Sequence, residues 1–509
     1  MLAKVRAAAL LGLEAYPIDV EVDVGGGLPA FAIVGLPDTA VQEAKERVRA
    51  AIRNSNYELP SRKITVNLAP ADIKKEGPVF DLPMAVGILA ATEQIRPQGL
   101  GGTLLLGELS LDGAIRPVSG MLSIALAAKA MRLHTLIVPE RNAGEAGLVE
   151  GITALPAASL LQVVRHLEGL DLIAPHVRPA RVPTEPAYDV DFTDIRGQQH
   201  ARRALEIAAA GGHNLLMVGP PGAGKTMLAR RLPTILPALD WDEALDVTRI
   251  YSAAGTHLNG GLPALARPFR SPHHTTSSAA LIGGGPVPKP GEVTLAHHGV
   301  LFLDELPEFH RDVLEVLRQP LEDGFITVAR VQSTLTFPAR FMLIAAMNPC
   351  PCGYHGDGRR ECLCTPPQIA RYLQRVSGPL LDRIDLHLEV PRVLSQDLLA
   401  QTPGEPSAAI RDRVAAARAR QHDRFGRGSA CNALMSPRQA RRQCQLGEEE
   451  REFLRSAIER LSLSARAYDR ILRIARTIAD LDGRHEVTLA DLAEAIQYRV
   501  FDRPLRLVG

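Results

Sequence analysis

Residues 219–226 constrain the fold of this chain more than any other stretch. They match the pattern G-x-x-x-x-G-K-[ST] without a mismatch, between an apolar run at 214–218 and a helix-like segment at 227–232. Glycines let backbone N–H groups turn toward an anion, and a helix N-terminus adds partial positive charge. The pattern therefore predicts a strand, a phosphate-binding loop and a helix, with the loop formed by Gly219, Pro220, Pro221, Gly222, Ala223, Gly224, Lys225 and Thr226.

Two later stretches carry polar side chains at the ends of apolar runs. Residues 300–305 end in Asp304 and Glu305, and residues 341–348 end in Asn348. Glu305 is expected to polarise the water that attacks a γ-phosphate, and Asn348 is expected to orient that water. The alternatives are a solvated acidic turn and an asparagine that forms a turn before a proline.

These stretches together predict ATP and Mg²⁺ as ligands. Lys225 is expected to reach the β- and γ-phosphates. The hydroxyl of Thr226 and the carboxylate of Asp304 are expected to hold Mg²⁺, directly or through water. Since a chance glycine turn would lack these partners, we expect a site for ATP hydrolysis.

Three further segments are expected to complete the nucleotide site. Residues 191–198, with Ile195, are expected to fold over the adenine, although an ordinary helix start is the alternative. Arg383 is expected to act as a finger on a neighbouring subunit's phosphates, which requires a ring or helical oligomer. Its alternative is a surface arginine paired with adjacent aspartates. Arg466 is expected to sense the nucleotide, with Arg470 as a competitor one turn later.

Composition favours a large cytoplasmic protein. The 509 residues allow two to four domains, and the net charge of +1 means that any nucleic-acid contact needs a local basic surface. Six cysteines in this length do not indicate a disulfide framework. No uncharged apolar segment approaches the roughly 20 residues of a membrane helix. We therefore expect no membrane partner.

Residues 1–172 are expected to form a separate α/β domain. Strands are predicted at 18–24, 63–68, 104–106 and 135–138, and helices at 39–53 and 82–92. The order of motifs resembles the Lon protease domain, which uses a serine–lysine dyad. At the matching positions this chain has Val79 and Leu122, which cannot act as nucleophile or base. The resemblance therefore implies a structural or interaction role. Four prolines predict a linker at 173–188.

Four cysteines form two close pairs in a polar segment at 350–364. Thiolates at this density suit a tetrahedral zinc ion, which would hold a loop too polar to fold alone. Free thiols are the alternative, because only one residue separates the cysteines within each pair. The predicted zinc ligands are Cys350, Cys352, Cys362 and Cys364.

The nucleotide motifs resemble those of AAA+ ATPases, with a core at 189–395 and a helical lid at 396–509. Three further motifs, RPFRSPHH at 267–274, PGEVTLAHHG at 290–299 and NPCPCG at 348–353, make the whole chain similar to the magnesium-chelatase-like ComM/YifB family. The resemblance implies a hexameric, ATP-driven DNA helicase that promotes branch migration when incoming DNA recombines in natural transformation. Its implied partners are single- and double-stranded DNA, branched junctions and recombination proteins.

In the AAA+ proteins that this chain resembles, an insert such as 269–289 projects into the ring channel. A hairpin is also predicted at 326–338. Arg270, Lys289 and Arg330 are expected to contact phosphates along a threaded strand, with help from His273 and His274. The alternatives are a protein partner for the loops, and packed or metal-binding roles for the histidines.

The arginines of the C-terminal segment are expected to form a solvated helix face, with DNA contact as the alternative; they are Arg411, Arg413, Arg418, Arg420 and Arg424. Three other functions remain open. The first is a chelatase-type motor that remodels a protein for metal insertion. The second is a DNA clamp that only binds nucleotide, which the presence of Glu305 disfavours. The third is a peptidase, which Val79 and Leu122 disfavour.

Overall fold

The computed structural model describes residues 2–177, 186, 188–256, 265–285, 288–329, 334–393, 404–426 and 431–499. The chain divides into two compact units, and each is made of two separate stretches of sequence. The first unit comprises Met1–Pro183 and Trp241–Ala264, and the second comprises Thr184–Asp240 and Leu265–Gly509. Among the described residues, every helix is too short or too polar to span a bilayer.

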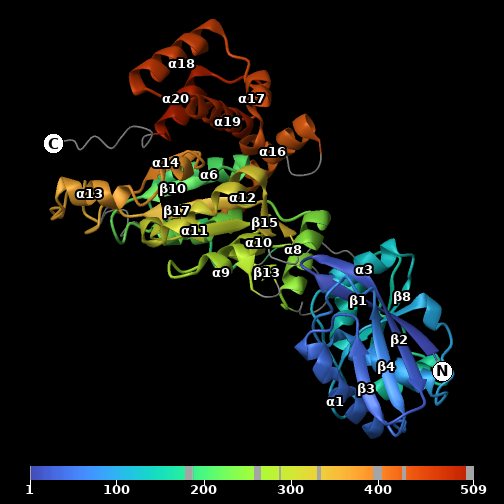
Figure 1. Ribbon diagram of the computed structural model, residues 1–509. Coiled ribbons are helices and arrows are strands. Elements are labelled where there is room, and N and C mark those ends of the chain that lie inside the picture. The colour runs from blue at the N-terminus through green and yellow to red at the C-terminus, as the bar shows by residue number, and fades with distance from the viewer. Residues whose placement is uncertain are drawn as a thin grey trace. The chain divides into compact units, whose positions relative to one another are not determined.

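The first unit is built on a seven-stranded mixed sheet (Figure 1). Long antiparallel strands pair on one side, and short parallel strands extend the sheet on the other. The predicted strands are present, and this sheet contains three more that were not predicted: β1 (Leu2–Leu11), β3 (Ala30–Val34) and β9 (Thr153–Ala157). In sheet order the strands are β3 (Ala30–Val34), β4 (Lys63–Ala69), β2 (Glu14–Gly25), β1 (Leu2–Leu11), β5 (Thr103–Leu105), β8 (Thr135–Pro139) and β9 (Thr153–Ala157).

Helices bury their apolar sides against this sheet. Leu122 lies on α3 and is fully buried in an apolar cluster, and Val79 packs against the same cluster. The two positions that match the Lon dyad therefore belong to the hydrophobic packing of the unit. Its helices are α1 (Thr39–Asn54), α2 (Asp81–Ala91), α3 (Met121–Ala130), α4 (Ala143–Gly147) and α5 (Leu160–Leu167), and a small hairpin joins β6 (Glu108–Leu109) to β7 (Ile115–Arg116).

The helix α8 (Trp241–Ala253) packs on the first unit, although it follows the phosphate loop in sequence. The Ser252 hydroxyl donates to the Glu145 carboxylate at 2.6 Å. Arg249 donates to the carbonyl of Leu13 at 2.7 Å. The prediction that the ATPase core spans 189–395 therefore does not hold for α8, because its sequence carries no local sign of the unit that it joins.

The second unit contains a five-stranded parallel sheet with a fully apolar centre. The runs before the phosphate loop, Asp304 and Asn348 are its three middle strands, and each is buried along its length. In sheet order the strands are β11 (Phe269–Arg270), β14 (Val300–Leu303), β17 (Met342–Met347), β10 (Leu215–Val218) and β18 (Leu386–Glu389).

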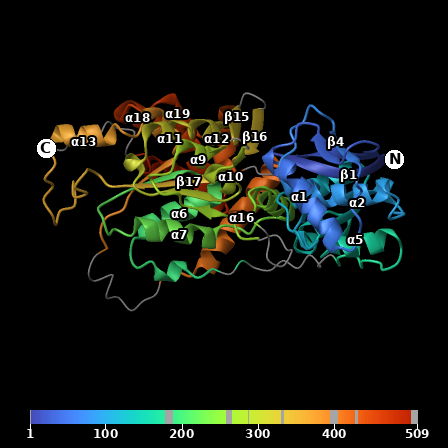
Figure 2. The same ribbon diagram turned by 60° about the horizontal axis from the view of Figure 1, so that its bottom comes forward.

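The C-terminal helices share one hydrophobic core with this sheet. Ile410, Val414 and Ala417 of α16 (Ser407–Phe425) belong to the same cluster as α6 (Gln199–Gly211) and α7 (Lys225–Ile235), and these three helices lie side by side in Figure 2. The other helices of this end are α17 (Pro437–Gln443), α18 (Glu448–Leu461), α19 (Ala465–Leu481) and α20 (Leu489–Gln497).

Short elements are inserted around the sheet. Two hairpins, β12 (Gly283–Gly284) with β13 (Lys289–Pro290) and β15 (Phe325–Ala329) with β16 (Thr334–Pro338), leave the core at the segments where the sequence predicts DNA contacts. The short helices are α9 (Ser278–Ile282), α10 (Glu292–Leu295), α11 (Arg311–Glu315), α12 (Arg318–Asp323), α13 (Pro366–Leu373) and α14 (Gly378–Leu381). The predicted α/β class is confirmed.

Candidate nucleotide site

The candidate site forms where three neighbouring parallel strands end at the same edge of the sheet. The phosphate loop follows β10, Asp304 follows β14 and Asn348 follows β17. Polar side chains placed after adjacent parallel strands meet in a crevice outside their carboxyl ends. The fold therefore brings together residues that lie 78 and 123 positions apart in sequence.

The phosphate loop positions Lys225 at the start of α7. Gly224 has a left-handed backbone with φ of 87°, which favours glycine. The Lys225 ammonium donates to the carbonyls of Gly219 at 2.6 Å and Pro220 at 3.0 Å, and to Asn348 Oδ1 at 3.1 Å. Burial lowers the pKa of Lys225, while Asp304 and Glu305 oppose this shift. The amine is thus surrounded by oxygen acceptors, the kind of partner that phosphate oxygens provide.

The cation-binding groups lie together beside the loop. The Thr226 hydroxyl donates to Asp304 Oδ2 at 2.6 Å, so both oxygens can face a single hard cation. The other Asp304 oxygen accepts the Glu305 N–H at 2.9 Å. These hydroxyl and carboxylate oxygens fit Mg²⁺, which would be held by Thr226 and Asp304.

Glu305 has a partner that sequence reasoning did not identify. Its backbone is left-handed, with φ of 53°, and its carboxylate lies 3.4 Å from Nδ1 of His274. The ring of His274 also lies against His273, with ring centroids 4.1 Å apart. The motif that contains both histidines, which the sequence analysis assigned to DNA, therefore contacts the predicted catalytic carboxylate. A histidine pair just after a strand is too common a pattern to have predicted this contact.

A cavity of about 400 Å³ lies over these groups. This volume is within the range of small-molecule sites. Its lining consists of residues 221–227 together with Asp304, Glu305, Met347 and Asn348.

The other predicted nucleotide residues lie outside that lining. Ile195 is fully buried in the apolar core, and its N–H donates to Phe192. The same segment reaches the phosphate loop through Gln198, whose amide donates to Ala223 at 2.8 Å. The adenine contact of Ile195 stays a prediction.

Arg383 is folded back onto its own chain. Its guanidinium pairs with Glu322 and donates to the carbonyl of Pro379 at 2.6 Å. The side chain is 9% exposed, and the Arg383 hydrogen bond and charge lower the pKa of Glu322. Its role at a neighbouring subunit stays a prediction.

Arg466 and Arg470 differ in their surroundings. Arg470 donates to the carbonyl of Ile384 at 2.9 Å and lies 3.7 Å from Asp385, with 13% of its side chain exposed. Arg466 is 65% exposed and lies 3.5 Å from Asp382. Arg470 therefore links the lid to the core through its contacts. Arg466 lies on the surface near Asp382, the residue before Arg383.

The predicted DNA-contacting residues have three different situations. Arg270 forms a bidentate ion pair with Glu292, in which two guanidinium nitrogens each lie 2.7 Å from a carboxylate oxygen. Lys289 is exposed on β13. Arg330 lies outside the described residues.

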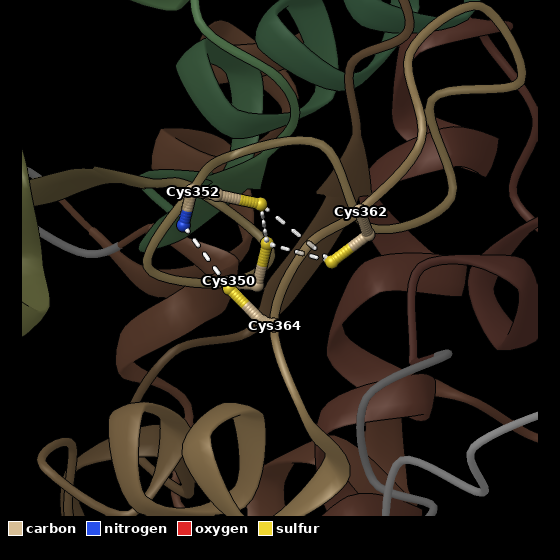
Figure 3. A group of neighbouring side chains, drawn as sticks. All are labelled: Cys350, Cys352, Cys362 and Cys364. Carbon is tan, nitrogen blue, oxygen red and sulfur yellow. Dashed lines mark hydrogen bonds between the residues drawn. The ribbon is translucent and has the colours of Figure 1, made fainter.

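The four predicted metal-binding cysteines converge (Figure 3). Their sulfur atoms all lie within 4.8 Å of one another, and they form no disulfide. The cluster is compatible with a bound zinc ion.

These features define an α/β ATPase of the AAA+ class. Family models cover most of the chain: "Magnesium chelatase, subunit ChlI" matches residues 191–398, "Subunit ChlI of Mg-chelatase" matches 20–142, and "Magnesium chelatase, subunit ChlI C-terminal" matches 404–499.

Individual relatives narrow the family. The chain is 48% identical to the uncharacterized protein YifB of Escherichia coli over 99% of this chain and 98% of that protein. It is 47% identical to competence protein ComM of Haemophilus influenzae over 99% of both chains. Part of it, 26% of the chain, is 33% identical to 25% of Lon protease 2 of Bacillus subtilis. The chain belongs to the magnesium-chelatase-like ComM/YifB family, as the sequence motifs predicted.

Proposed function

We propose that this protein is an ATP-driven DNA motor, a helicase that promotes branch migration when incoming DNA recombines during natural transformation. The observation that carries the proposal is the convergence of Lys225, Thr226, Asp304, Glu305 and Asn348 around one cavity. The full-length similarity to a competence protein supports the role in natural transformation.

In this proposal each polar group has one task. Lys225 binds the β- and γ-phosphates, and Thr226 and Asp304 hold Mg²⁺, which neutralises charge developing on the phosphates. Glu305 accepts a proton from the attacking water, and Asn348 orients that water. His274 restrains the Glu305 carboxylate at the edge of the cavity.

We propose that the active form is a homo-oligomeric ring, with six subunits as the family resemblance implies. Arg383 acts on the nucleotide of the neighbouring subunit. Arg466 lies 3.5 Å from Asp382, and we propose that it senses the bound nucleotide.

We also propose that Cys350, Cys352, Cys362 and Cys364 bind one structural zinc ion. Four thiolates in a closed set are a common structural zinc site. The convergence of their sulfur atoms supports this assignment.

A second candidate is a motor that remodels a protein partner for metal insertion. The magnesium chelatase name of all three family models favours it. It shares the ATP site with the first candidate and differs in what stimulates hydrolysis.

The test compares the ATPase rate without DNA, with single-stranded DNA and with a four-way junction. We expect DNA to stimulate hydrolysis, and the Glu305→Gln variant to bind ATP but to lose at least about 100-fold in rate. A rate that DNA leaves unchanged, in a protein that still hydrolyses ATP, would overturn the DNA role and favour a protein substrate.

A further inference from the structure

We infer that the zinc site is a positioning device for ATP hydrolysis: the metal-closed loop at 350–364 holds Asn348 and Pro221 in place. This inference rests on the proposed ATP site and the proposed zinc site, and not on the DNA role. Its physical basis is that the cysteine loop begins two residues after Asn348 and folds back onto the phosphate loop.

The sulfur geometry suits one tetrahedral ion. Sγ of Cys350 lies 3.3 Å from Cys352 and 3.7 Å from Cys362, and the Cys352–Cys362 distance is 3.6 Å. Four sulfurs bound to zinc at about 2.3 Å lie about 3.8 Å apart along each edge of a tetrahedron. Figure 3 shows Cys350, Cys352 and Cys362 directed toward a common centre, with Cys364 beside the Cys352 backbone at 3.4 Å.

Apolar packing does not account for the shape of this loop. Cys350 is fully buried, but Leu363, the only leucine in the loop, is 85% exposed. Most of the remaining loop residues are glycine, charged or polar. In a segment of this composition, metal binding supplies folding free energy that a hydrophobic core would otherwise supply.

The loop touches the phosphate loop directly. A Cβ placed on Gly353 would lie 2.7 Å from Cδ of Pro221 and 3.8 Å from Cγ of Asn348. Gly353 also has a left-handed backbone, with φ of 85°. The absence of a side chain at Gly353 therefore allows the two loops to approach within packing distance.

The far end of the loop returns to Asn348 as well. Cys364 precedes Thr365, the N-terminal cap of α13, whose N–H donates to the Gln368 side chain in the first turn at 2.9 Å. Burial raises the pKa of Tyr372 on this helix to about 12, and the backbone of Asn348 opposes that shift, so the Tyr372 hydroxyl lies beside Asn348. Asn348 in turn bonds Lys225 at 3.1 Å, so closure of the loop on both sides fixes a residue of the nucleotide site.

The first measurement is the metal content of the native full-length protein by mass spectrometry, with its ATPase rate measured without DNA. We expect one zinc per chain. Cys352→Ser and Cys364→Ser are expected to lose the zinc and to lower the ATPase rate by about tenfold or more, because Asn348 and Pro221 lose their support. Cys431→Ser, a buried cysteine outside the cluster, is the matched control and should keep both zinc and rate.

A second variant separates positioning from folding. Gly353→Ala leaves all four ligands, so we expect it to retain zinc while its Cβ pushes on Pro221 and lowers the rate. Native protein without zinc, zinc-free variants that hydrolyse ATP at the native rate, or a Gly353→Ala variant of native rate would each overturn the inference. The proposed ATP site itself would fail on a different result, a Lys225→Ala variant that still binds and hydrolyses ATP.

Discussion

The contacts of Arg383 within its own chain bear on its proposed role at a neighbouring subunit. In the single chain its guanidinium is paired with Glu322 and largely covered. To reach a neighbouring phosphate it must exchange this carboxylate for the nucleotide. An exchange of one anion for another keeps the arginine charge compensated in both states.

A mixing experiment tests whether Arg383 acts between subunits. Arg383→Ala and Glu305→Gln are each expected to lose about 10³-fold in ATPase rate. In a mixed ring, a subunit with intact Glu305 meets a neighbour with intact Arg383 at about one quarter of random interfaces. An equal mixture should therefore recover about a quarter of the native rate.

The controls for this experiment are each variant alone and each variant mixed with native protein. A mixture of the two variants that recovers no activity, although both assemble with native subunits, would show that Arg383 and Glu305 act within one chain.

Two residues near the inserted hairpins, Arg270 and Lys289, were both predicted to contact DNA, but their surroundings in the fold differ. Arg270 on β11 is paired with Glu292 on α10, an interaction that joins the edge strand of the sheet to this short helix. Lys289 lies exposed on β13. Lys289 is thus the better placed of the two to reach a phosphate backbone.

Lys289→Ala is expected to weaken binding of single-stranded DNA. Because one phosphate contact is lost, the slope of log affinity against log salt should fall by about one unit. Fluorescence anisotropy over a salt series measures both quantities. Lys129→Ala, at an exposed lysine of the first unit, is the matched control, and equal effects of the two substitutions would contradict a specific role for Lys289.

Two arginines of helix α16 make contacts within the fold instead of facing solvent. The expectation of a solvated arginine face is wrong for Arg418 and Arg424. Arg418 donates to the carbonyl of Ala209 at 2.9 Å, and Arg424 pairs with the buried carboxylate of Asp480 at 2.6 Å. These arginines join α16 to α6 and to α19, so their role is structural.

At the scale of the whole molecule, a buried histidine links stability to pH. His297 is 4% exposed, and its Nδ1 accepts the N–H of Arg340 at 3.0 Å. Burial, together with smaller contributions from the nearby His298 and Arg340, lowers the pKa of His297 to about 3. The folded protein therefore keeps this ring neutral in conditions where an unfolded chain protonates it.

Stability of the second unit should fall as the pH drops below about 6.5, the pKa of an unfolded histidine. Below that pH the His297 ring is protonated in the unfolded state, whereas in the folded state it stays neutral down to about pH 3. At pH 5 this difference in protonation lowers the free energy of unfolding by about 2 kcal/mol. Denaturant unfolding at pH 7.5 and pH 5 measures it.

His297→Asn retains an acceptor for the Arg340 N–H but cannot be protonated, so it should reduce the loss of stability at low pH. His310→Asn, at a side chain that is 78% exposed, is the control. A His297→Asn protein that loses as much stability as the native protein would contradict the assignment.

Much of the second unit was predictable from sequence because its signals are local. The glycine pattern of the phosphate loop requires left-handed turns, and each apolar run before Asp304 and Asn348 is long enough for a buried strand. The same applies to the cysteine pairs, whose density in a polar segment indicated their convergence.

Local sequence signals were thus enough to predict the phosphate loop, the strands that carry its polar partners, and the family. The contact of His274 with Glu305, the packing of the cysteine loop against Pro221 and the place of α8 in the first unit became known only from the folded chain. These contacts depend on the order of strands in a sheet and on the direction of side chains, and local periodicity and spacing record neither.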